Sequence, residues 1–397
     1  MPSLLQRWFG RADQREVKDS RAGPLIAFYD QGRPRWTPRD YAALAREGYQ
    51  KNAVAFRCVR LVAESVASAP MLLFDGRREL DEHPFLALMS APNPRDGGAS
   101  FLEAIASYLL VAGNAYIESV LVDGEPRELY ALRPDRMRVV PGVGGWADAY
   151  DYTVEASTVR FRQDRAPVPS ILHLNFFHPL DDHYGLAPME AAASALDIHN
   201  AAGQWNKALL DNAARPSGAL VYAAGDHAHL SDAQFARLKA ELEENFQGAV
   251  NAGRPLLLEG GLDWKPLSLS PKDMDFIEAK AAAAREIALA FGVPPMLIGL
   301  PGDATYANYQ EANRAFWRQT VTPLALRIAR ALLQWLKPAW PDARNLRAEI
   351  DLDQIPALSE ERKALWDRVL SAGEVLSEDE RRSALGYGAR ASAASDG

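Results

Sequence analysis

Cysteine is nearly absent from this chain, and features that mark several other classes of protein are missing as well. Cys58 is the single cysteine among 397 residues, so no disulfide can form within one chain, which indicates a reducing compartment. Because Cys58 falls on the apolar stripe of a predicted helix, we expect a buried thiol. No apolar run approaches the roughly 20 residues that cross a bilayer, and the N-terminus lacks the apolar core of a secretory signal. No membrane partner is expected.

Positive charge is also in short supply. Lys and Arg total 44 against 52 Asp and Glu, which gives a formal net charge of -8. This balance argues against a protein held on nucleic acid by phosphate contacts. Arg outnumbers Lys by 35 to 9, which we interpret as the signature of a GC-rich genome. The hydrophobic share of 48% and the length are those of a globular chain with two or three domains.

Recognised catalytic motifs are missing too. The sequence has no Gly-rich phosphate loop, no G-x-S-x-G and no H-E-x-x-H. The best enzyme-like cluster is 173-HLNFFHPLDDHYG-185, which holds His173, His178, Asp181, Asp182 and His183. A metal-dependent enzyme could use such residues, but their spacing matches no recognised metal site. The favoured interpretation is a strand end followed by a polar turn, so we expect no catalytic residue, no metal and no cofactor.

The first half of the chain predicts an α+β domain. A helix is expected at 53–69 and a second at 101–112, with Ser100 and Glu103 as a capping box and Gly113 as the end. The predicted strands are 71–74, 115–122, 127–132, 136–140, 150–155, 158–162 and 171–175. Asp123-Gly124 is a turn between two of them, so an antiparallel sheet is expected.

The middle of the chain predicts two long helices, at 187–212 and 271–291, that flank a small β-α-β-β unit. That unit has a strand at 219–224, a helix at 232–247 and a hairpin with the turn Gly260-Gly261. Both long helices are rich in Ala, and the second has an apolar stripe at Ile277, Ala281, Ala284, Ala288 and Phe291. We expect these helices to pack between subunits, at positions such as Ala283 and Ala284.

The last third begins with a stretch that breaks helical order and carries polar and aromatic residues. Its residues are Gly299, Pro301, Gly302, Asp303, Thr305, Tyr306, Asn308 and Tyr309. A long helix at 309–336 follows, and Pro323 inside it predicts a kink. Short helices are expected at 359–371 and 378–385, capped by Ser359 and Ser377.

Local motifs match a known family from about residue 50 to 388. The matching stretches are AVAFRCVRLVAESVASAPMLLF, HPFLALMSAPNP, LLVAGNAYIE with ELYALRPDRM, the helix start Gly185-Leu186-Ala187-Pro188, NAGRPLLLEGGLDWKPLSLSPKDMDFIE and EIALAFGVPPMLIG. On these stretches the chain resembles the portal proteins of tailed bacteriophages, of the long-tailed type. It differs near the C-terminus, where it has SEDERR and the family often has Asn-Glu-x-x-Arg. Its short length and GC-rich composition are similar to those of portals of gene transfer agents, phage-derived particles that package host DNA.

The resemblance implies a ring, usually a dodecamer, at one capsid vertex of a virion or phage-like particle assembled in the bacterial cytoplasm. The ring would be the channel for packaging and ejecting double-stranded DNA. Its partners would be the large terminase subunit, the head–tail adaptor and the major capsid protein. The chain would not be an enzyme, and the motor would be a separate protein. The alternative outside this family is a helical interaction or adaptor protein that forms a monomer or dimer.

The resemblance also divides the chain into the parts of a portal fold. These would be an α+β wing with an N-terminal arm (1–186), a stem helix (187–212), a clip (213–270), a second stem helix (271–298), a tunnel loop (299–309), a long kinked helix with a return to the wing (310–352), and a helical crown with a disordered tail (353–397). The residues expected to face DNA in the channel are Gly299, Pro301, Gly302, Asp303, Thr305, Tyr306 and Asn308, and the clip turn is Gly260 with Gly261.

Overall fold

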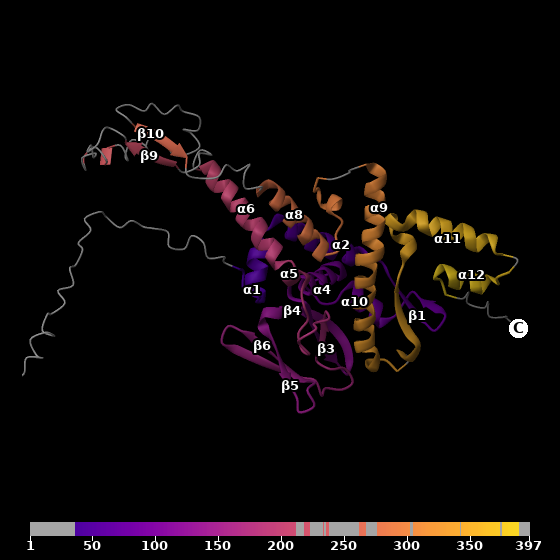
Figure 1. The fold of residues 1–397 in the computed structure, drawn as a ribbon. Coiled ribbons are helices and arrows are strands. Elements are labelled where there is room, and N and C mark those ends of the chain that lie inside the picture. Colours follow the sequence, from indigo (N-terminus) through magenta and orange to yellow (C-terminus); the bar gives the residue numbers. More distant parts are fainter. Residues whose placement is uncertain are drawn as a thin grey trace, which may run out of the picture. The chain divides into compact units, whose positions relative to one another are not determined.

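A computed structural model describes residues 36–211, 218–222, 233, 236–237, 262–266, 276–301, 305–341, 343–373 and 375–388 (Figure 1). The chain divides into two compact units, Met1–Trp36 and Thr37–Gly397, and the elements below belong to the second. Among the described residues, no helix has both the length and the apolar character required to span a membrane.

Helices make up most of the described structure. They are α1 (Tyr41–Leu44), α2 (Ala53–Ser68), α3 (Pro84–Ser90), α4 (Gly98–Ala112), α5 (Pro188–Ala191), α6 (Ala193–Asp211), α8 (Phe276–Ala290), α9 (Tyr306–Phe316), α10 (Thr322–Leu336), α11 (Ser359–Ser371) and α12 (Glu378–Leu385). Two π-helical turns are η2 (Ala45–Gln50) and η6 (Trp317–Val321). Short 3₁₀ turns are η3 (Pro134–Arg136), η5 (Pro295–Ile298), η7 (Lys337–Ala339), η8 (Ala343–Asn345), η9 (Leu352–Gln354) and η10 (Pro356–Leu358).

The strands form antiparallel sheets. They are β1 (Met71–Asp75), β2 (Arg78–Leu80), β3 (Asn114–Val122), β4 (Glu125–Leu132), β5 (Met137–Pro141), β6 (Ala147–Val154), β7 (Ser157–Arg162), β8 (Ile171–Asn175), β9 (Gly218–Tyr222), β10 (Leu262–Pro266) and β11 (Leu346–Ile350). Where one sheet was expected in the first half, the structure has two three-stranded sheets there, in the orders β4-β3-β8 and β5-β6-β7.

A third sheet joins a late strand, β11, to two strands from the first part of the fold. β11 pairs with β1, with Met71 opposite Ile350 and Asp75 opposite Leu346, and β2 completes the order β11-β1-β2. The sequence prediction missed β11, although its residues alternate between buried and more exposed positions, as a strand with one covered face does. This pairing ties residues after the long helix back to the first part of the fold.

The core is built around α2 and α4, which pack against each other, and α2 also packs against α10. One face of α2 is buried, and it consists of Ala55, Cys58, Val59, Val62, Ala63 and Val66. Burial of each Val side chain stabilises the folded state by roughly 1.5–3 kcal/mol. Cys58 has no exposed surface, and its burial raises the pKa of the thiol to about 12. The expectation of a buried, unreactive cysteine is confirmed.

Two of the predicted helix caps are wrong. α4 begins at Gly98 rather than 101, and a side chain at Gly98 would lie 1.9 Å from the Met89 carbonyl oxygen. This close approach fixes the helix start before Ser100 and Glu103, so they cannot cap it. Ser359 has helical backbone angles and lies inside α11, because η10 leads directly into that helix. The cap at Ser377 is confirmed, since Ser377 and Glu380 form a reciprocal capping box.

The small unit between the long helices is described only in part. β9 pairs with β10, with Tyr222 opposite Leu262, so the predicted strand at 219–224 and the second hairpin strand are present. Of the predicted helix 232–247, residues 233, 236 and 237 are described, and they are helical. The turn Gly260-Gly261, the predicted N-terminal arm and most of the predicted C-terminal tail lie outside the described residues.

Two glycines with positive φ have different surroundings. Gly113 ends α4 at φ 71°, and a side chain there would lie 2.2 Å from the Gly185 carbonyl oxygen. Gly124 has φ 83° and follows Asp123 at φ 53° in the predicted β3–β4 turn. A side chain added at Gly124 would meet no other atom within 4 Å. Both glycines need a left-handed backbone, but only Gly113 also needs the space.

We therefore expect Gly113→Ala to be clearly more destabilising than Gly124→Ala. The left-handed backbone costs alanine about 1–2 kcal/mol at either site, and the overlap at Gly113 raises the total to at least about 3 kcal/mol. Urea unfolding followed by circular dichroism measures both losses. Equal losses for the two variants would show that the Gly113–Gly185 approach does not constrain the fold.

Candidate functional site

The two long helices that flank the small unit pack on each other. α6 has 19 residues and is about 28 Å long at about 1.5 Å per residue. The predicted helix 187–212 is broken at Ala192, which separates α5 from α6. Ala283 and Ala284 of α8 are each 3% exposed within the single chain, because α8 packs on α2, α5 and α6. At these two positions the expected contact between subunits is therefore wrong.

A buried amide joins α6 to the core. Asn52 is 1% exposed and caps α2, since its Oδ1 accepts hydrogen bonds from the backbone N–H groups of Val54 and Ala55. Its Nδ2 donates to Asn200 Oδ1 at 2.9 Å and lies 3.1 Å from His199 Nδ1, both on α6. Burial, and then the charge of Lys280, lowers the pKa of His199, so a neutral ring faces Asn52 near pH 7. Both ends of the Asn52 amide are thus used, and α6 is fixed in register against α2.

The segment between α8 and α9 contains several residues that end a helix or fix the backbone locally. α8 ends at Ala290, and Gly292 beyond it has a φ of 64° and a carbonyl oxygen that accepts a 2.7 Å hydrogen bond from Thr320 Oγ1 of η6. η5 ends at Gly299 with φ 77°. Arg285 Nη2 then donates to the Pro301 carbonyl oxygen at 2.9 Å, and the Thr305 side chain caps α9 by accepting from the Asn308 N–H. The start of the 299–309 segment is therefore held to α8, and its end is capped as the first turn of α9.

Exposed aromatic side chains mark the far edge of this segment. Tyr306 is 78% exposed and Tyr309 is 47% exposed. They border a cavity of about 420 Å³, which is lined by Met296, Gly299, Leu300, Pro301, Thr305, Tyr306 and Tyr309. Of the residues expected to face DNA, the structure thus places Gly299, Pro301, Thr305 and Tyr306 around one cavity, with Asn308 in the first turn of α9. Gly302 and Asp303 lie outside the described residues, as do Gly260 and Gly261.

A kink was predicted at Pro323 in the long helix that follows, and the structure has a π-helical turn just before this proline. η6 joins α9 to α10, and the Thr322 N–H donates to the Trp317 carbonyl oxygen five residues back. Pro323 has no N–H group to donate to the preceding turn, and a wider turn at this point accommodates its ring without that hydrogen bond. α10 is the buried part, with Trp335 Nε1 donating to the Pro169 carbonyl oxygen at 3.0 Å, whereas Phe316 is the only buried residue of α9.

Arginines link α9 and η6 to the C-terminal helix pair, which is α11 with α12. Arg314 of α9 pairs with Glu360 at 2.7 Å and with Glu311 at 3.2 Å. Arg318 of η6 pairs with Glu361 at 3.5 Å. Exposed pairs of this kind stabilise by at most about 1 kcal/mol each, so they position α11 against α9 without locking it.

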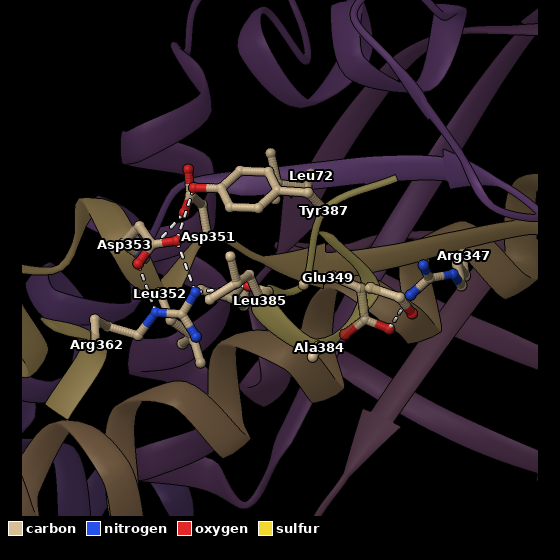
Figure 2. A pocket seen from close by; sticks show the side chains of 13 residues that line it. Leu72, Arg347, Glu349, Asp351, Leu352, Asp353, Arg362, Ala384, Leu385 and Tyr387 are labelled. Carbon is tan, nitrogen blue, oxygen red and sulfur yellow. Dashed lines mark hydrogen bonds and ion pairs between the residues drawn. The ribbon is translucent and has the colours of Figure 1, made fainter. Parts of the chain in front are cut away.

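A stronger attachment is the carboxylate hub, which consists of Asp353, Arg362, Trp366 and Tyr387. Arg362 forms two hydrogen bonds to the Asp353 carboxylate at 2.6 and 2.7 Å. Tyr387 OH donates to Asp353 Oδ2 at 2.7 Å, and Trp366 Nε1 donates to Oδ1 at 3.1 Å. Figure 2 shows Arg362 and Tyr387 converging on Asp353 at a pocket of about 530 Å³.

The hub fixes both helices of the pair. Arg362 Nη2 also donates to the Leu385 carbonyl oxygen at 2.6 Å, which holds the end of α12. The hydrogen bonds from Arg362 lower the pKa of Asp353 to about 2, and burial together with the bond to Asp353 raises the pKa of Tyr387 to about 12. Sequence reasoning missed this hub, because nothing in the local pattern pairs Asp353 with a tyrosine 34 positions later.

The 173–185 cluster is not assembled as a metal site. His173 stacks on Tyr116 at 4.3 Å, its Nε2 lies 2.9 Å from Asn114 Oδ1, and burial lowers its pKa to about 4. His178 and Asp181 accept hydrogen bonds from backbone N–H groups of the same turn. Within the described part of the chain, no group of three or more His, Cys, Asp and Glu residues could hold a metal ion.

We expect Asp353→Asn to destabilise the C-terminal helix pair by about 2–3 kcal/mol, because charge-assisted hydrogen bonds from Arg362 and Tyr387 are weakened. Asp164→Asn is the matched control, since Asp164 also accepts hydrogen bonds from an arginine, Arg162, but is exposed, and it should change stability little. Thermal unfolding compares the two variants. A loss for Asp353→Asn no larger than that of the control would mean that the hub is not an anchor.

Acid should release the same helix pair. Because the pKa of Asp353 in the folded chain lies below its ordinary value, folding favours the ionised carboxylate. The stabilisation is complete above the ordinary pKa of 3.8 and is lost as the pH falls toward about 2. Hydrogen exchange of peptides from α11 and α12 should rise across this window, ahead of peptides from α2. Uniform behaviour of all these peptides would contradict the assignment.

Comparison with known proteins identifies the family. The profile of the family described as phage portal protein matches residues 53–386. A chain in the solved neck of an empty gene transfer agent (GTA) particle, computed with C6 symmetry, is 54% identical, with a TM-score of 0.71 and coverage of 90% of this chain and 96% of that chain. A chain in the neck of a native GTA particle, computed with C12 symmetry, is 53% identical, with a TM-score of 0.68 and the same coverage.

A relative in a named phage agrees. The portal protein of Enterobacteria phage HK97 is 26% identical over 317 residues, which are 76% of this chain and 70% of that protein. The predicted resemblance and the predicted α+β portal fold are confirmed. With a family match that covers most of its length, this chain belongs to the phage portal protein family.

Proposed function

We propose that the chain forms a ring at one capsid vertex of a phage-like particle of the gene transfer agent type, and that double-stranded DNA passes through the ring during packaging and ejection. The observation that carries the proposal is membership of the portal family across residues 53–386. The similarity to chains in GTA necks supports the type of particle. The C12 symmetry of one of those necks supports twelve subunits.

The parts of the ring are assigned as the resemblance to portal proteins implies. We assign 1–186 to the wing, with α6 and α8 in the stem helices 187–212 and 271–298, and 213–270 to the clip. Residues 299–309 are the tunnel loop, 310–352 the long helix and return to the wing, and 353–397 the crown and tail. The carboxylate hub supports a crown that begins near Asp353, because it attaches α11 and α12 as one piece.

The tunnel loop assignment rests on where its anchors lie. Arg285 holds the start of the segment to α8, Thr305 caps α9 at its end, and Tyr306 beside that cap exposes most of its surface. An aromatic side chain exposed at the edge of such a segment can face a pore. Asp303 would add negative charge beside DNA, so passing phosphates would be repelled rather than gripped.

Charge supports a sliding channel. A ring of chains that each carry -8 is strongly negative, and phosphate contacts strong enough to hold DNA need the opposite sign. The chain would supply the channel and the docking surface, and the large terminase subunit would supply the energy. The head–tail adaptor and the major capsid protein are the other proposed partners. We assign no catalysis to the chain, and no cluster among the described residues favours the enzyme or the small adaptor protein.

Deleting residues 301–306 tests the channel role. We expect rings that assemble, because the anchors of α8 and α10 remain, but particles that package or retain little DNA. Tyr306→Ala is the milder variant, and Trp146→Ala is its matched control, since Trp146 is an aromatic side chain of similar exposure on the β5–β6 turn. DNA content per particle is the measurement. Normal content in the deletion variant would remove the loop from the channel.

A further inference from the structure

The structure has a loop with exposed apolar side chains to which the proposed portal function assigns no role. Phe177 is 82% exposed and Leu180 is 92% exposed. They stand on the turn between β8 and α5, and we name residues 176–184 the β8–α5 knob. Two large apolar side chains displayed on one short turn are typical of a contact surface.

The knob is held rigidly by its own side chains. His178 Nδ1 accepts the Leu180 N–H at 3.1 Å, and Asp181 Oδ1 accepts the N–H groups of His183 and Tyr184 at 2.8 and 2.9 Å. Phe176 anchors its first end, because its N–H donates to the Gly113 carbonyl oxygen at 2.9 Å. An apolar surface that is ordered before binding loses little conformational entropy when it is covered.

The last residue of the knob is tied to one side of a sheet. Tyr184 OH accepts the Val139 N–H of β5 at 3.0 Å, and its ring packs on the buried cluster under β5 and β6. In the order β5-β6-β7, β5 and β7 are the two outer strands. The knob therefore lies on the β5 side, and β7 forms the opposite edge.

Within the described part of the chain, that opposite edge is exposed to solvent. Five of the six residues of β7 are exposed, and Val159 exposes 51% of its surface. An exposed edge strand of this kind readily pairs with another chain unless something covers it. One side of the domain thus presents a rigid apolar knob, and the other side presents an open strand.

The charges of the two sides are complementary. The knob carries Asp181 and Asp182, whereas residues 157–165 hold three arginines against one aspartate. Arg160 and Arg162 already pair within the chain but keep 60% and 74% of their side chains exposed. Attraction between an acidic knob and a basic edge favours this pairing of surfaces over knob against knob.

We propose that the β8–α5 knob of one subunit packs against the β7 edge of the next copy of this chain, as a head-to-tail contact. Two different surfaces on opposite sides of one domain are what a ring requires, since a head-to-tail interface closes when its rotation divides the circle. The inference rests on the proposed ring and assigns one of its contacts. A second exposed apolar pair among the described residues, Val143 and Trp146, lies at the end of β5 and β6 and not at a side of the sheet.

The test compares Phe177→Ser/Leu180→Ser with Val143→Ser/Trp146→Ser, two pairs of exposed apolar side chains. Sedimentation and electron micrographs give the fraction of chains in rings. We expect that fraction to fall at least about tenfold for the knob variant, because each covered apolar side chain accounts for roughly a factor of ten in affinity. The control should assemble like the wild type. Unchanged melting of the unassembled knob variant would show that it still folds.

Cross-linking tests which surface receives the knob. Leu180→Cys with Val159→Cys should give a ladder of linked multimers with a short thiol cross-linker, and each single variant should give none, because a head-to-tail contact brings unlike positions together. Cys58 has no exposed surface and should not react. Rings that form equally well in the knob variant, with no ladder from the cysteine pair, overturn the contact and leave the portal function intact. A wild-type chain that forms no ring overturns the proposed function itself.

Discussion

One buried amide holds together the parts of the fold that a channel would need. Asn52 starts α2, the central core helix, and at the same time donates to Asn200 on α6. Asn200 in turn donates to the Glu47 carbonyl oxygen in η2, so three segments meet at one side chain. Asn52 is 1% exposed, and a buried amide that lost these partners would cost about 1–3 kcal/mol. This junction holds α6, and α8 packs on α6 as well as directly on α2 and α5.

Beyond that junction, some elements are held together by hydrogen bonds and burial, and others expose side chains to solvent. The turn after α8 is held to η6 by the hydrogen bond from Thr320 to Gly292, and η6 continues into the buried helix α10. The 299–309 segment is held to α8 at its start by Arg285 and carries the exposed ring of Tyr306 at its end. On the other side of η6, Arg314 contacts α11 and the carboxylate hub fixes α12. α9 therefore begins in the 299–309 segment and pairs with α11 through Arg314, and Figure 1 shows α10 continuing below it.

The sequence predicted most elements, because local signals determine them. Gly113 ended a helix and Asp123-Gly124 made a turn where the backbone requires positive φ. Errors arose where tertiary contact overrides the local pattern. The approach of Gly98 to Met89 starts α4 early, and η10 places Ser359 inside a helix. The division into two sheets and the partner of β11 depend on pairing between distant strands, which no local pattern specifies.

The sequence predicted where the candidate site lies but not the hydrogen-bonded residues that hold the elements around it. Gly299, Pro301 and Tyr306 signalled an exposed break between helices, and the structure places all three at one cavity. The Asp353 hub and the Asn52 junction were missed, because each joins residues that are far apart in the sequence. The small residues of α8 predicted close helix packing, but the sequence alone does not say whether a neighbouring subunit or the same chain covers Ala284. In the structure, Ala284 is buried by its own chain.

The central claim is that this chain is the wall of a DNA channel, and a reconstruction of the purified full-length protein by electron cryomicroscopy tests it most directly. The account predicts closed rings in which α6 and α8 surround a central channel and the 299–309 segment faces the axis. Particles that remain monomers or dimers would contradict it. Rings in which Tyr306 faces the outside would contradict the channel assignment in the same way.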